Sequence, residues 1–273
     1  MTRKFSVVTT FHQAGYDKYG SRMIDTFLAN WPQEVHLYVY AEDCTVTQTA
    51  PNLTVYDFHS RVPALVAFKD QYRDDPRANG RLPMGPVDAK GKQRGIGFKW
   101  DAVRFSHKIY AVCDAARTTV DTVFWMDADM VCHSPITLAT LDRLMPPTAD
   151  IAYLGRKGKY TECGLWAIDM SKSSNMLFVS WMQEAYDQAE TGVFAMKEFH
   201  DCWVFDRTRE RLQAQVPAWQ QLDWSAHLVM GEGHPLINTE WGAYLDHLKG
   251  NRKDSGRSKS KDLVVNRTEG YWK

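Results

Sequence analysis

The chain has 273 residues, of which 44% are hydrophobic and 24% are charged, and its formal net charge is zero at pH 7. This composition is close to that of ordinary folded domains, which excludes disordered, coiled-coil and collagen-like chains, and the length suits one large α/β domain. Zero net charge also excludes a global attraction to nucleic acid or to an anionic membrane, so any such attraction has to come from local patches.

Two stretches of the chain are basic. Residues 61–108 hold eleven Lys and Arg against five Asp, and residues 249–273 hold eight against three acids. The five cysteines are odd in number, scattered and never in CxxC spacing, which argues against a disulfide framework or a zinc knuckle and favours a reducing, cytoplasmic setting. The apolar run at the start is too short for a signal peptide, and we expect no integral membrane segment.

The first half of the chain alternates strand and helix patterns. We expect strands at residues 5–10, 35–40 and 53–58, a helix at 19–30, a long irregular loop at 73–97 that is rich in Gly, Pro and charge, and a helix at 100–116. Alternating strands and helices predict parallel β-α-β units in a sheet that is covered on both faces. Ligands then bind at the carboxyl ends of the strands.

The second half continues the pattern. We expect strands at residues 123–126, 151–154 and 165–168, helices at 175–188, 201–212 and 240–248, and a polar segment at 251–261 that is mobile without a ligand. The predicted organisation is a catalytic domain at residues 1–248 followed by a basic tail at 249–273 that closes over a bound ligand.

Asp127 and Asp129 directly follow the apolar strand at 123–126. Two carboxylates at a strand end repel each other unless a cation joins them, and hard oxygen ligands suit Mg²⁺ or Mn²⁺, which complete their shells with water and phosphate oxygens. The alternative is that both residues cap a turn, where Asp is common. The buried strand immediately before them favours the metal site.

The segment Val123-Phe-Trp-Met-Asp-Ala-Asp-Met-Val131 resembles the Asp-x-Asp segment of the GT-A-fold glycosyltransferases, and most closely that of the glycogenin-like and lipopolysaccharide-glucosyltransferase-like group. The segment 162–168 is similar to a later strand of that group, and the resemblance spans roughly residues 5–253. It implies a GT-A fold, which is Rossmann-like α/β with a mixed, mainly parallel central sheet flanked by helices. It also implies that Asp127 reaches the ribose and the metal, and that Asp129 binds the metal.

Near the end of the chain, His247-Leu-Lys-Gly250-Asn-Arg-Lys253 matches the His-x-x-Gly-x-x-Lys spacing of the same group. The resemblance implies that His247 is a third metal ligand and that Gly250 and Lys253 contact the diphosphate. The Pro-Trp that follows this Lys in the group is replaced by Asp254 and Ser255. A histidine at a helix C-terminus is the alternative interpretation of His247.

Two further positions are candidates for donor binding. Thr9, Thr10 and Phe11 end the first strand, where this fold holds the nucleotide base, although they are also ordinary strand residues. Lys99 precedes the helix before the Asp-x-Asp strand, where similar enzymes have a Lys that contacts the donor; a solvated helix start is the alternative.

Asp201 and Glu162 are the candidate catalytic carboxylates. The pair His200-Asp201 stands where the group has an Asp that contacts the donor hexose, and a carboxylate there can accept a proton or stabilise an oxocarbenium-like centre. The alternatives are a helix N-cap for Asp201 and a surface loop acid for Glu162.

These residues predict a metal-dependent glycosyltransferase, using Mn²⁺ or Mg²⁺, that moves a hexose from a nucleotide-diphospho-sugar to an acceptor hydroxyl, and the donor that we expect is a UDP-sugar. A nucleotidyltransferase is the second hypothesis, although a Gly-rich, basic loop is missing after the first strand. A non-catalytic nucleic-acid-binding protein is the third, and net neutrality weighs against it. The basic stretches also fit a polyanionic acceptor, either a phosphorylated glycan or DNA with hydroxylated bases.

Overall fold

The computed structural model describes residues 3–119, 121–228 and 234–273. Its centre is a seven-stranded sheet with the order β10-β8-β9-β6-β1-β2-β3. Four of the six strand pairs are parallel, and β9 runs antiparallel to both of its neighbours. The strands of this sheet are β1 (Phe5–His12), β2 (His36–Glu42), β3 (Leu53–Asp57), β6 (Thr122–Met126), β8 (Ile151–Leu154), β9 (Glu162–Asp169) and β10 (Gln221–Asp223).

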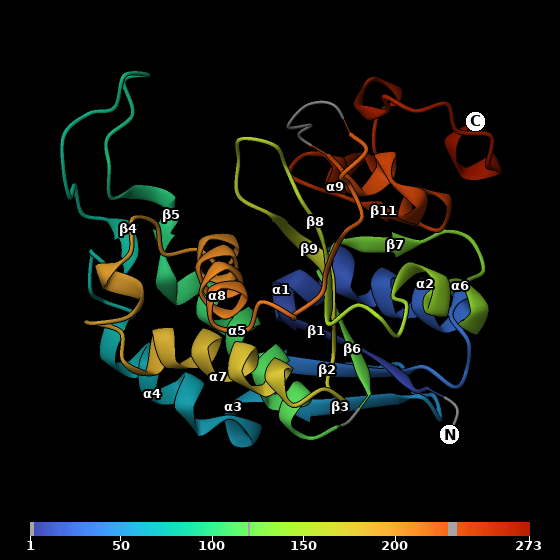
Figure 1. Cartoon of the computed structure of the whole chain (residues 1–273), viewed down its shortest axis with the longest axis horizontal. Coiled ribbons are helices and arrows are strands. Elements are labelled where there is room, and N and C mark those ends of the chain that lie inside the picture. Colours follow the sequence, from blue (N-terminus) through green and yellow to red (C-terminus); the bar gives the residue numbers. More distant parts are fainter. Residues whose placement is uncertain (1–2, 120, 229–233) are drawn as a thin grey trace.

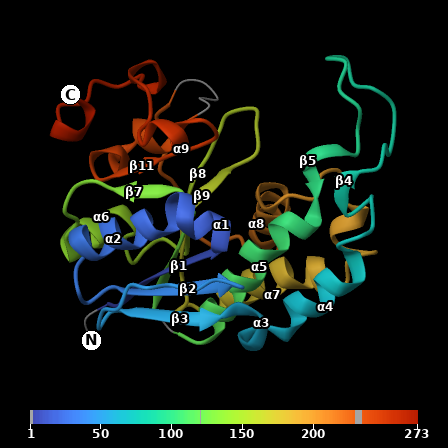
Figure 2. The same ribbon diagram turned by 180° about the vertical axis from the view of Figure 1, so that it is seen from behind.

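Helices cover both faces of this sheet (Figures 1 and 2). One apolar core holds side chains of α3 (Phe58–Arg61), α4 (Pro63–Tyr72), α5 (Ala102–Arg117), α7 (Ser174–Asp187) and α8 (Asp201–Gln215). The other holds side chains of α2 (Ser21–Asn30), α6 (Leu138–Leu144) and the segment from residue 236 to 245. Consecutive residues of β6 alternate between the two cores, as they do in a strand that is buried on both faces. The predicted α/β class, with a mixed, mainly parallel sheet flanked by helices, is confirmed.

The first helix begins differently from the prediction. A short α1 (Gln13–Gly15) and a π-helical turn (Tyr16–Gly20) lead into α2. An added Cβ at Gly15 would lie 2.9 Å from the hydroxyl oxygen of Tyr19, and one at Gly20 would lie 3.0 Å from the ring of Phe11. The chain therefore packs this turn tightly against the end of β1.

The stretch at 73–97, predicted as an irregular loop, contains ordered pairing. β4 (Asn79–Arg81) pairs antiparallel with β5 (Ile96–Asp101), and Val87 forms a bridge with Gln93 further out. The intervening hairpin extends away from the body of the molecule (Figure 1); we call residues 82–95 the arm. The pairing of the two strands needs glycine, since Gly80 in β4 has φ +68° and an added Cβ would lie 2.4 Å from the carbonyl oxygen of Gly97. Gly and Pro density signalled the turns but hid the two strands.

The helix predicted at 240–248 is wrong. A 3₁₀ turn (Glu240–Ala243) is followed by β11 (Leu245–His247), which pairs antiparallel with β7 (Met130–Cys132). His247 therefore ends a strand, and the helix-dipole interpretation no longer applies.

The tail is folded against the molecule. A short α9 (Arg252–Ser255) is followed by two 3₁₀ turns (Ser260–Asp262 and Gly270–Trp272). Ser258 donates its backbone N–H and its hydroxyl to the buried carboxylate of Asp246 in β11, at 2.7 and 2.6 Å, and the Tyr271 hydroxyl donates to the same group. One buried acid thus connects two separate parts of the tail to β11, and the mobility expected for residues 251–261 without a ligand stays a prediction. No helix within the described residues has the length and apolar character needed to cross a bilayer.

Candidate active site

The site lies where three strand ends meet. Asp127 follows β6, and its backbone N–H donates to the carbonyl of Gly164 in the neighbouring β9 at 2.8 Å. The pairing of β7 with β11 sets His247 opposite Met130, and the N–H of Leu248 donates to the carbonyl of Asp129 at 2.9 Å. The sheet register thus brings the end of the chain beside the Asp-x-Asp segment.

The side chains of Asp127, Asp129 and His247 converge. His247 Nε2 lies 3.0 Å from Asp129 Oδ1 and 3.6 Å from Asp127 Oδ2, and one ligand atom from each of the three residues lies within 4.8 Å of the others. Two carboxylates and an imidazole form a donor set that suits Mn²⁺ or Mg²⁺ with additional water or phosphate ligands.

A glycine makes room for the imidazole of His247. A Cβ at Gly164 would lie 2.4 Å from His247 Cε1 and 2.6 Å from Nδ1, so a larger residue would displace the ring. Nδ1 is buried and has no hydrogen-bond partner among the described residues, and it lies 3.7 Å from Glu162 Oε1. The ring is therefore held by packing, with Nε2 turned toward the two aspartates.

Two lysines balance the aspartates. Lys253 Nζ lies 2.9 Å from Asp129 Oδ2, and Lys108 Nζ lies 2.8 Å from Asp127 Oδ1. Burial alone would raise the pKa of Asp129, but the positive charges of His247 and Lys253 outweigh it and hold the pKa well below its usual range. The carboxylate is therefore ionised and ready to accept a cation.

Asp201 belongs to the same network. It is the first residue of α8, is 3% exposed, and its Oδ2 lies 2.7 Å from Lys108 Nζ, so one ammonium joins Asp127 and Asp201. Burial would raise the pKa of Asp201, but Lys108 and His200 lower it. His200, not Asp201, occupies the N-cap position. Asp201 is therefore a buried, ionised carboxylate that faces the aspartate pair.

Glu162 begins β9 and is 6% exposed, so it is not a surface loop acid. It contacts Lys249, lies 3.6 Å from Arg156 Nη1, and accepts the backbone N–H of Gly164 at 3.2 Å. It thus stands on the opposite side of His247 from the aspartates.

The predicted contacts to the nucleotide base find no support in the structure. Thr9 is fully buried, Thr10 already donates to the carbonyl of Tyr40 at 2.7 Å, and Phe11 is 5% exposed and packs against Tyr16. A ring that is covered in this way has no face for a base to stack on. These residues form the floor beneath the site.

Lys99 and Gly250 are two further residues that the sequence predicts to bind the donor. Lys99 lies in β5, not at the start of α5, and forms an ion pair with Glu198 at 2.8 Å. Gly250 follows β11 with φ +58°, and a Cβ there would meet open space. Its backbone is therefore accessible beside Lys253.

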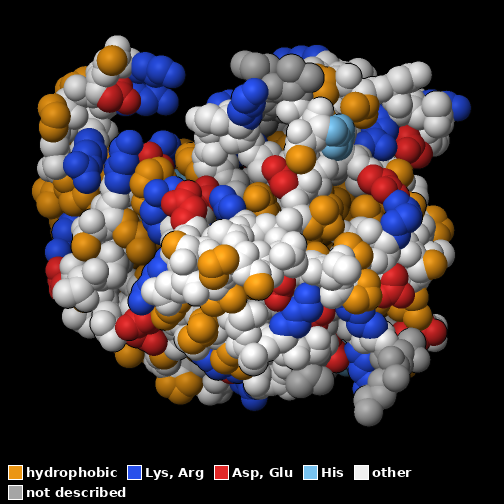
Figure 3. Space-filling view, viewed as in Figure 1, with side chains coloured by type: hydrophobic (Ala, Val, Ile, Leu, Met, Phe, Trp, Pro, Cys, Tyr) orange, Lys and Arg blue, Asp and Glu red, His pale blue; other side chains and the backbone are white. Residues whose placement is uncertain are grey.

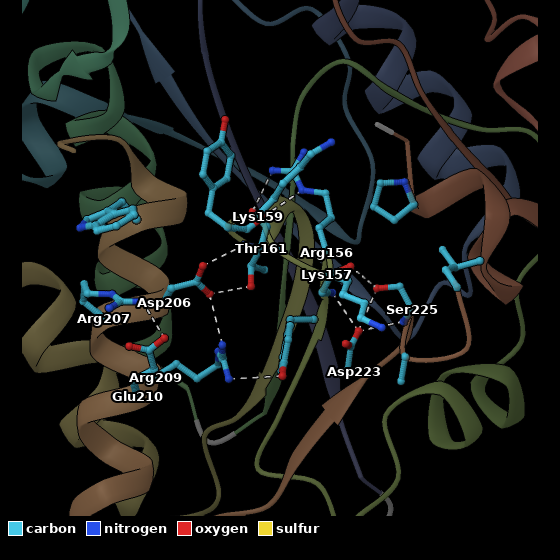
Figure 4. A pocket seen from close by; sticks show the side chains of 18 of the residues that line it. Arg156, Lys157, Lys159, Thr161, Asp206, Arg207, Arg209, Glu210, Asp223 and Ser225 are labelled. Carbon is cyan, nitrogen blue, oxygen red and sulfur yellow. Dashed lines mark hydrogen bonds and ion pairs between the residues drawn. The ribbon is translucent and has the colours of Figure 1, made fainter. Parts of the chain in front are cut away.

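A second feature is a cavity of about 950 Å³ beside this centre. Its walls are the 155–161 segment between β8 and β9, one face of α8, and the segment after β10 (Figure 4). Its basic lining residues are Lys99, Arg156, Lys157, Lys159, Arg207 and Arg209. We call it the basic pocket. It adjoins the centre through Arg156, which lines the pocket and approaches Glu162.

The sequence predictions did not include Lys108, Arg156 and Lys249 as site residues. Lys108, Arg156 and Lys249 come from separate segments of the chain and reach the site only through the fold. Trp125 also contributes, by donating its indole N–H to Asp127 Oδ1 at 2.7 Å from within the buried strand.

No family model and no curated protein sequence matches the chain. Among solved structures, it is similar to mouse xyloside xylosyltransferase 1 (9% identity over 80% of this chain and 84% of that chain, TM-score 0.45). It is also similar to the apo glycosyltransferase GlyE of Streptococcus pneumoniae (14%, 81% and 46%, TM-score 0.42) and to an active-site mutant of LgtC (12%, 74% and 69%, TM-score 0.41). The chain thus spans less than half of the GlyE chain that it matches.

Proposed function

We propose that this protein is a metal-dependent glycosyltransferase that moves a hexose from a UDP-type donor to an acceptor hydroxyl. The observation that carries the proposal is the convergence of Asp127, Asp129 and His247 at the carboxyl edge of the sheet. Ligands of open α/β sheets bind at this edge. The resemblance of the Asp-x-Asp segment to that of the GT-A-fold glycosyltransferases supports the same function.

Asp127, Asp129 and His247 are the residues that would hold the metal. Their donor atoms, the room that Gly164 leaves for the imidazole, and the present neutralisation of Asp129 by an ammonium all fit a divalent cation. A bound Mn²⁺ or Mg²⁺ would stabilise negative charge on the diphosphate leaving group.

The other residues divide the remaining tasks. Lys253, with the open backbone at Gly250, is placed to bind the diphosphate once a metal replaces its ammonium on Asp129. During transfer the bond from the anomeric carbon to the diphosphate oxygen breaks and a bond to the acceptor oxygen forms. Asp201 accepts the acceptor's proton or positions the sugar, and Glu162 is the alternative carboxylate for this role.

Two other groups of residues also bring potential ligands together. In one, both oxygens of Glu42 are already engaged, by His59 and Lys69 on Oε1 and by His107 on Oε2. In the other, two of the three potential ligands are the sulfurs of Cys163 and Cys202, which suit softer metals than Mn²⁺ or Mg²⁺. The aspartate pair is therefore the better metal site.

The test is Asp129→Asn, which keeps the shape of the side chain and removes its charge. We expect UDP release from UDP-sugars in the presence of Mn²⁺ to fall by on the order of 10²-fold or more, because even partners of metal ligands are worth 10- to 100-fold. Asp74→Asn is the control, since that carboxylate is 99% exposed and should leave turnover unchanged.

Full activity of the Asp129→Asn variant would overturn the metal assignment. Release of pyrophosphate instead of UDP would indicate a nucleotidyltransferase. A thermal-shift screen of nucleotide sugars with Mn²⁺ identifies the donor, because a bound ligand raises Tm.

A further inference from the structure

The acids in the wall of the basic pocket are engaged by the protein itself. Asp206 accepts the backbone N–H and the hydroxyl of Thr161 at 2.9 and 2.6 Å, and Asp223 accepts the N–H of Gly155 at 2.8 Å and both donors of Ser225. These bonds shape the pocket wall, as Figure 4 shows. Asp206 also pairs with Arg209 of the lining, with 3.4 Å between Nη2 and Oδ1.

The remaining acids at the pocket are held in ion pairs. Glu198 contacts Lys99 and His200, both at 2.8 Å, and Glu210 accepts from Arg207 at 2.6 Å. Lys157, in contrast, is exposed and forms no ion pair with the described residues. Six Lys and Arg against four acids leave the lining with an excess of positive charge, to which the exposed Lys157 contributes.

Aromatic rings in this pocket lie between cations. Tyr160 has Lys99 Nζ at 5.3 Å and the Arg156 guanidinium at 4.7 Å from its ring centre. Trp203 has Lys197 Nζ at 5.7 Å and the Arg207 guanidinium at 4.9 Å. Rings interleaved with positive charge are the arrangement that binds stacked bases and phosphates of single strands.

The arm extends this positive surface. Lys90, Lys92 and Arg94 are exposed and form no ion pair with any part of the chain that the structure describes. The arm's one acid, Asp88, accepts the backbone N–H groups of Lys90 and Lys92 at 2.8 and 2.9 Å and so closes the turn. Figure 3 shows a hollow between the arm and the body, with Lys and Arg side chains on both sides.

The base of the arm reaches the pocket directly. Phe98 in β5 is 49% exposed and its ring lies 6.0 Å from that of His200, while the next residue, Lys99, lines the pocket. Arm and pocket therefore form one continuous track that ends beside Glu162, through Arg156.

We propose that the acceptor is a nucleic-acid strand, bound along the arm and with one nucleotide inserted in the basic pocket. This inference rests on the proposed function and names its acceptor. A polymer with regularly spaced phosphates matches a track of separate cations, and the flanked rings of Tyr160 and Trp203 match bases. A cavity of about 950 Å³ has room for an extruded nucleotide, and a hydroxyl group on its modified base would be the acceptor. Arg156 in the pocket wall lies 3.6 Å from Glu162, which links this cavity to the candidate catalytic carboxylates.

The test is binding of a short fluorescein-labelled DNA, as single strand and as duplex, measured by anisotropy over a range of salt concentrations. The test variant is Lys92→Gln with Arg94→Gln, and the control is Lys4→Gln with Arg117→Gln, which removes the same charges from the opposite end of the strands. We expect the wild-type protein to bind with a steep salt dependence. The slope of log K against log salt should shrink by about 2 in the test variant and stay unchanged in the control.

Several outcomes would overturn the inference. One is no binding of either DNA by the wild-type protein, and another is an equal loss in the test and control variants. A third is transfer to a phosphorylated glycan, such as phosphomannan, with no binding of DNA. Donor hydrolysis is measured in parallel. DNA binding without donor hydrolysis would overturn the proposed function, whereas donor hydrolysis without DNA binding would overturn this inference alone.

Discussion

The aspartate centre and the basic pocket adjoin each other but differ in how far their acidic and basic side chains balance each other. At the centre, Asp127, Asp129 and Asp201 are compensated by Lys108, Lys253 and His247, which come from distant parts of the chain. In the pocket, Asp206 and Asp223 bond to the backbone of the wall, and six Lys and Arg line the cavity against four acids. The centre is thus balanced before a ligand arrives, whereas the pocket keeps more cations than acids and the arm adds Lys90, Lys92 and Arg94 against Asp88.

This difference separates two kinds of site. Under the proposed function, the compensated centre would exchange its own cations for a metal, so its geometry exists in advance and would cost little to reorganise. An uncompensated basic surface gains its binding energy from the charge of the ligand, so that its affinity depends on salt. Substitutions that change either a charge or a side-chain volume at the aspartate centre should disrupt that centre and leave the basic pocket intact.

The largest effect is expected for Lys108→Met. This change removes the ammonium between Asp127 and Asp201 and leaves two carboxylates facing each other, one of them buried. Breaking a buried ion pair from one side costs about 3–5 kcal/mol. Urea denaturation should show a loss of this size in the free energy of unfolding.

Lys253→Met is the matched control for that experiment. Its side chain is 23% exposed, against 11% for Lys108, and it contacts one carboxylate instead of two. We expect a clearly smaller loss of stability. Equal losses in the two variants would contradict the view that Lys108 holds the centre together.

The sheet and the Asp-x-Asp site were predictable because their signals are local. An apolar run followed directly by two acids predicts both the strand and the position of the charges at its end. Helices such as α5 and α7 are predicted by the periodicity of their apolar residues. The pairing of β4 with β5 was missed because Gly80 and Gly97, both with positive φ, interrupt these strands. β11 was missed because three residues carry too little pattern. The pocket could not be predicted, since loop 155–161, α8 and the β10 segment meet only in the folded chain.

The next effect concerns the shape of the centre. Gly164→Ala would place a methyl group 2.4 Å from His247 Cε1, and the buried ring would have to shift. We expect a loss of stability of about 1–3 kcal/mol from overpacking. Mn²⁺ binding, measured by calorimetry, should weaken by roughly 10- to 100-fold because the imidazole leaves its position.

Gly250→Ala is the control, because it strains the backbone without displacing the imidazole of His247. Its φ of +58° makes alanine unfavourable by about 1–2 kcal/mol, but the new Cβ would meet open space. We expect lower stability with unchanged Mn²⁺ affinity. If Mn²⁺ affinity fell equally in both variants, the role assigned to Gly164 would be wrong.

The smallest effect is a pH dependence at the rim of the pocket. Burial alone would lower the pKa of His200, but its contacts with Cys202 and Glu198 outweigh burial and raise the pKa to about 9. Because the pKa in the folded state exceeds the unfolded value, this stabilisation is fully present below about pH 6.5 and is lost as the pH rises through about 9. His200→Gln should therefore reduce stability by about 1–2 kcal/mol at pH 6, with a difference from wild type that shrinks toward pH 9.

His36→Gln is the control for that pH range. Burial lowers the pKa of His36, so its titration affects stability only below pH 6.5, where protonation of the unfolded chain is favoured. The two variants should thus change the pH profile in separate windows. A constant difference between wild type and His200→Gln from pH 6 to pH 9 would mean that His200 is uncharged, and that Glu198 at the pocket is balanced by Lys99 alone.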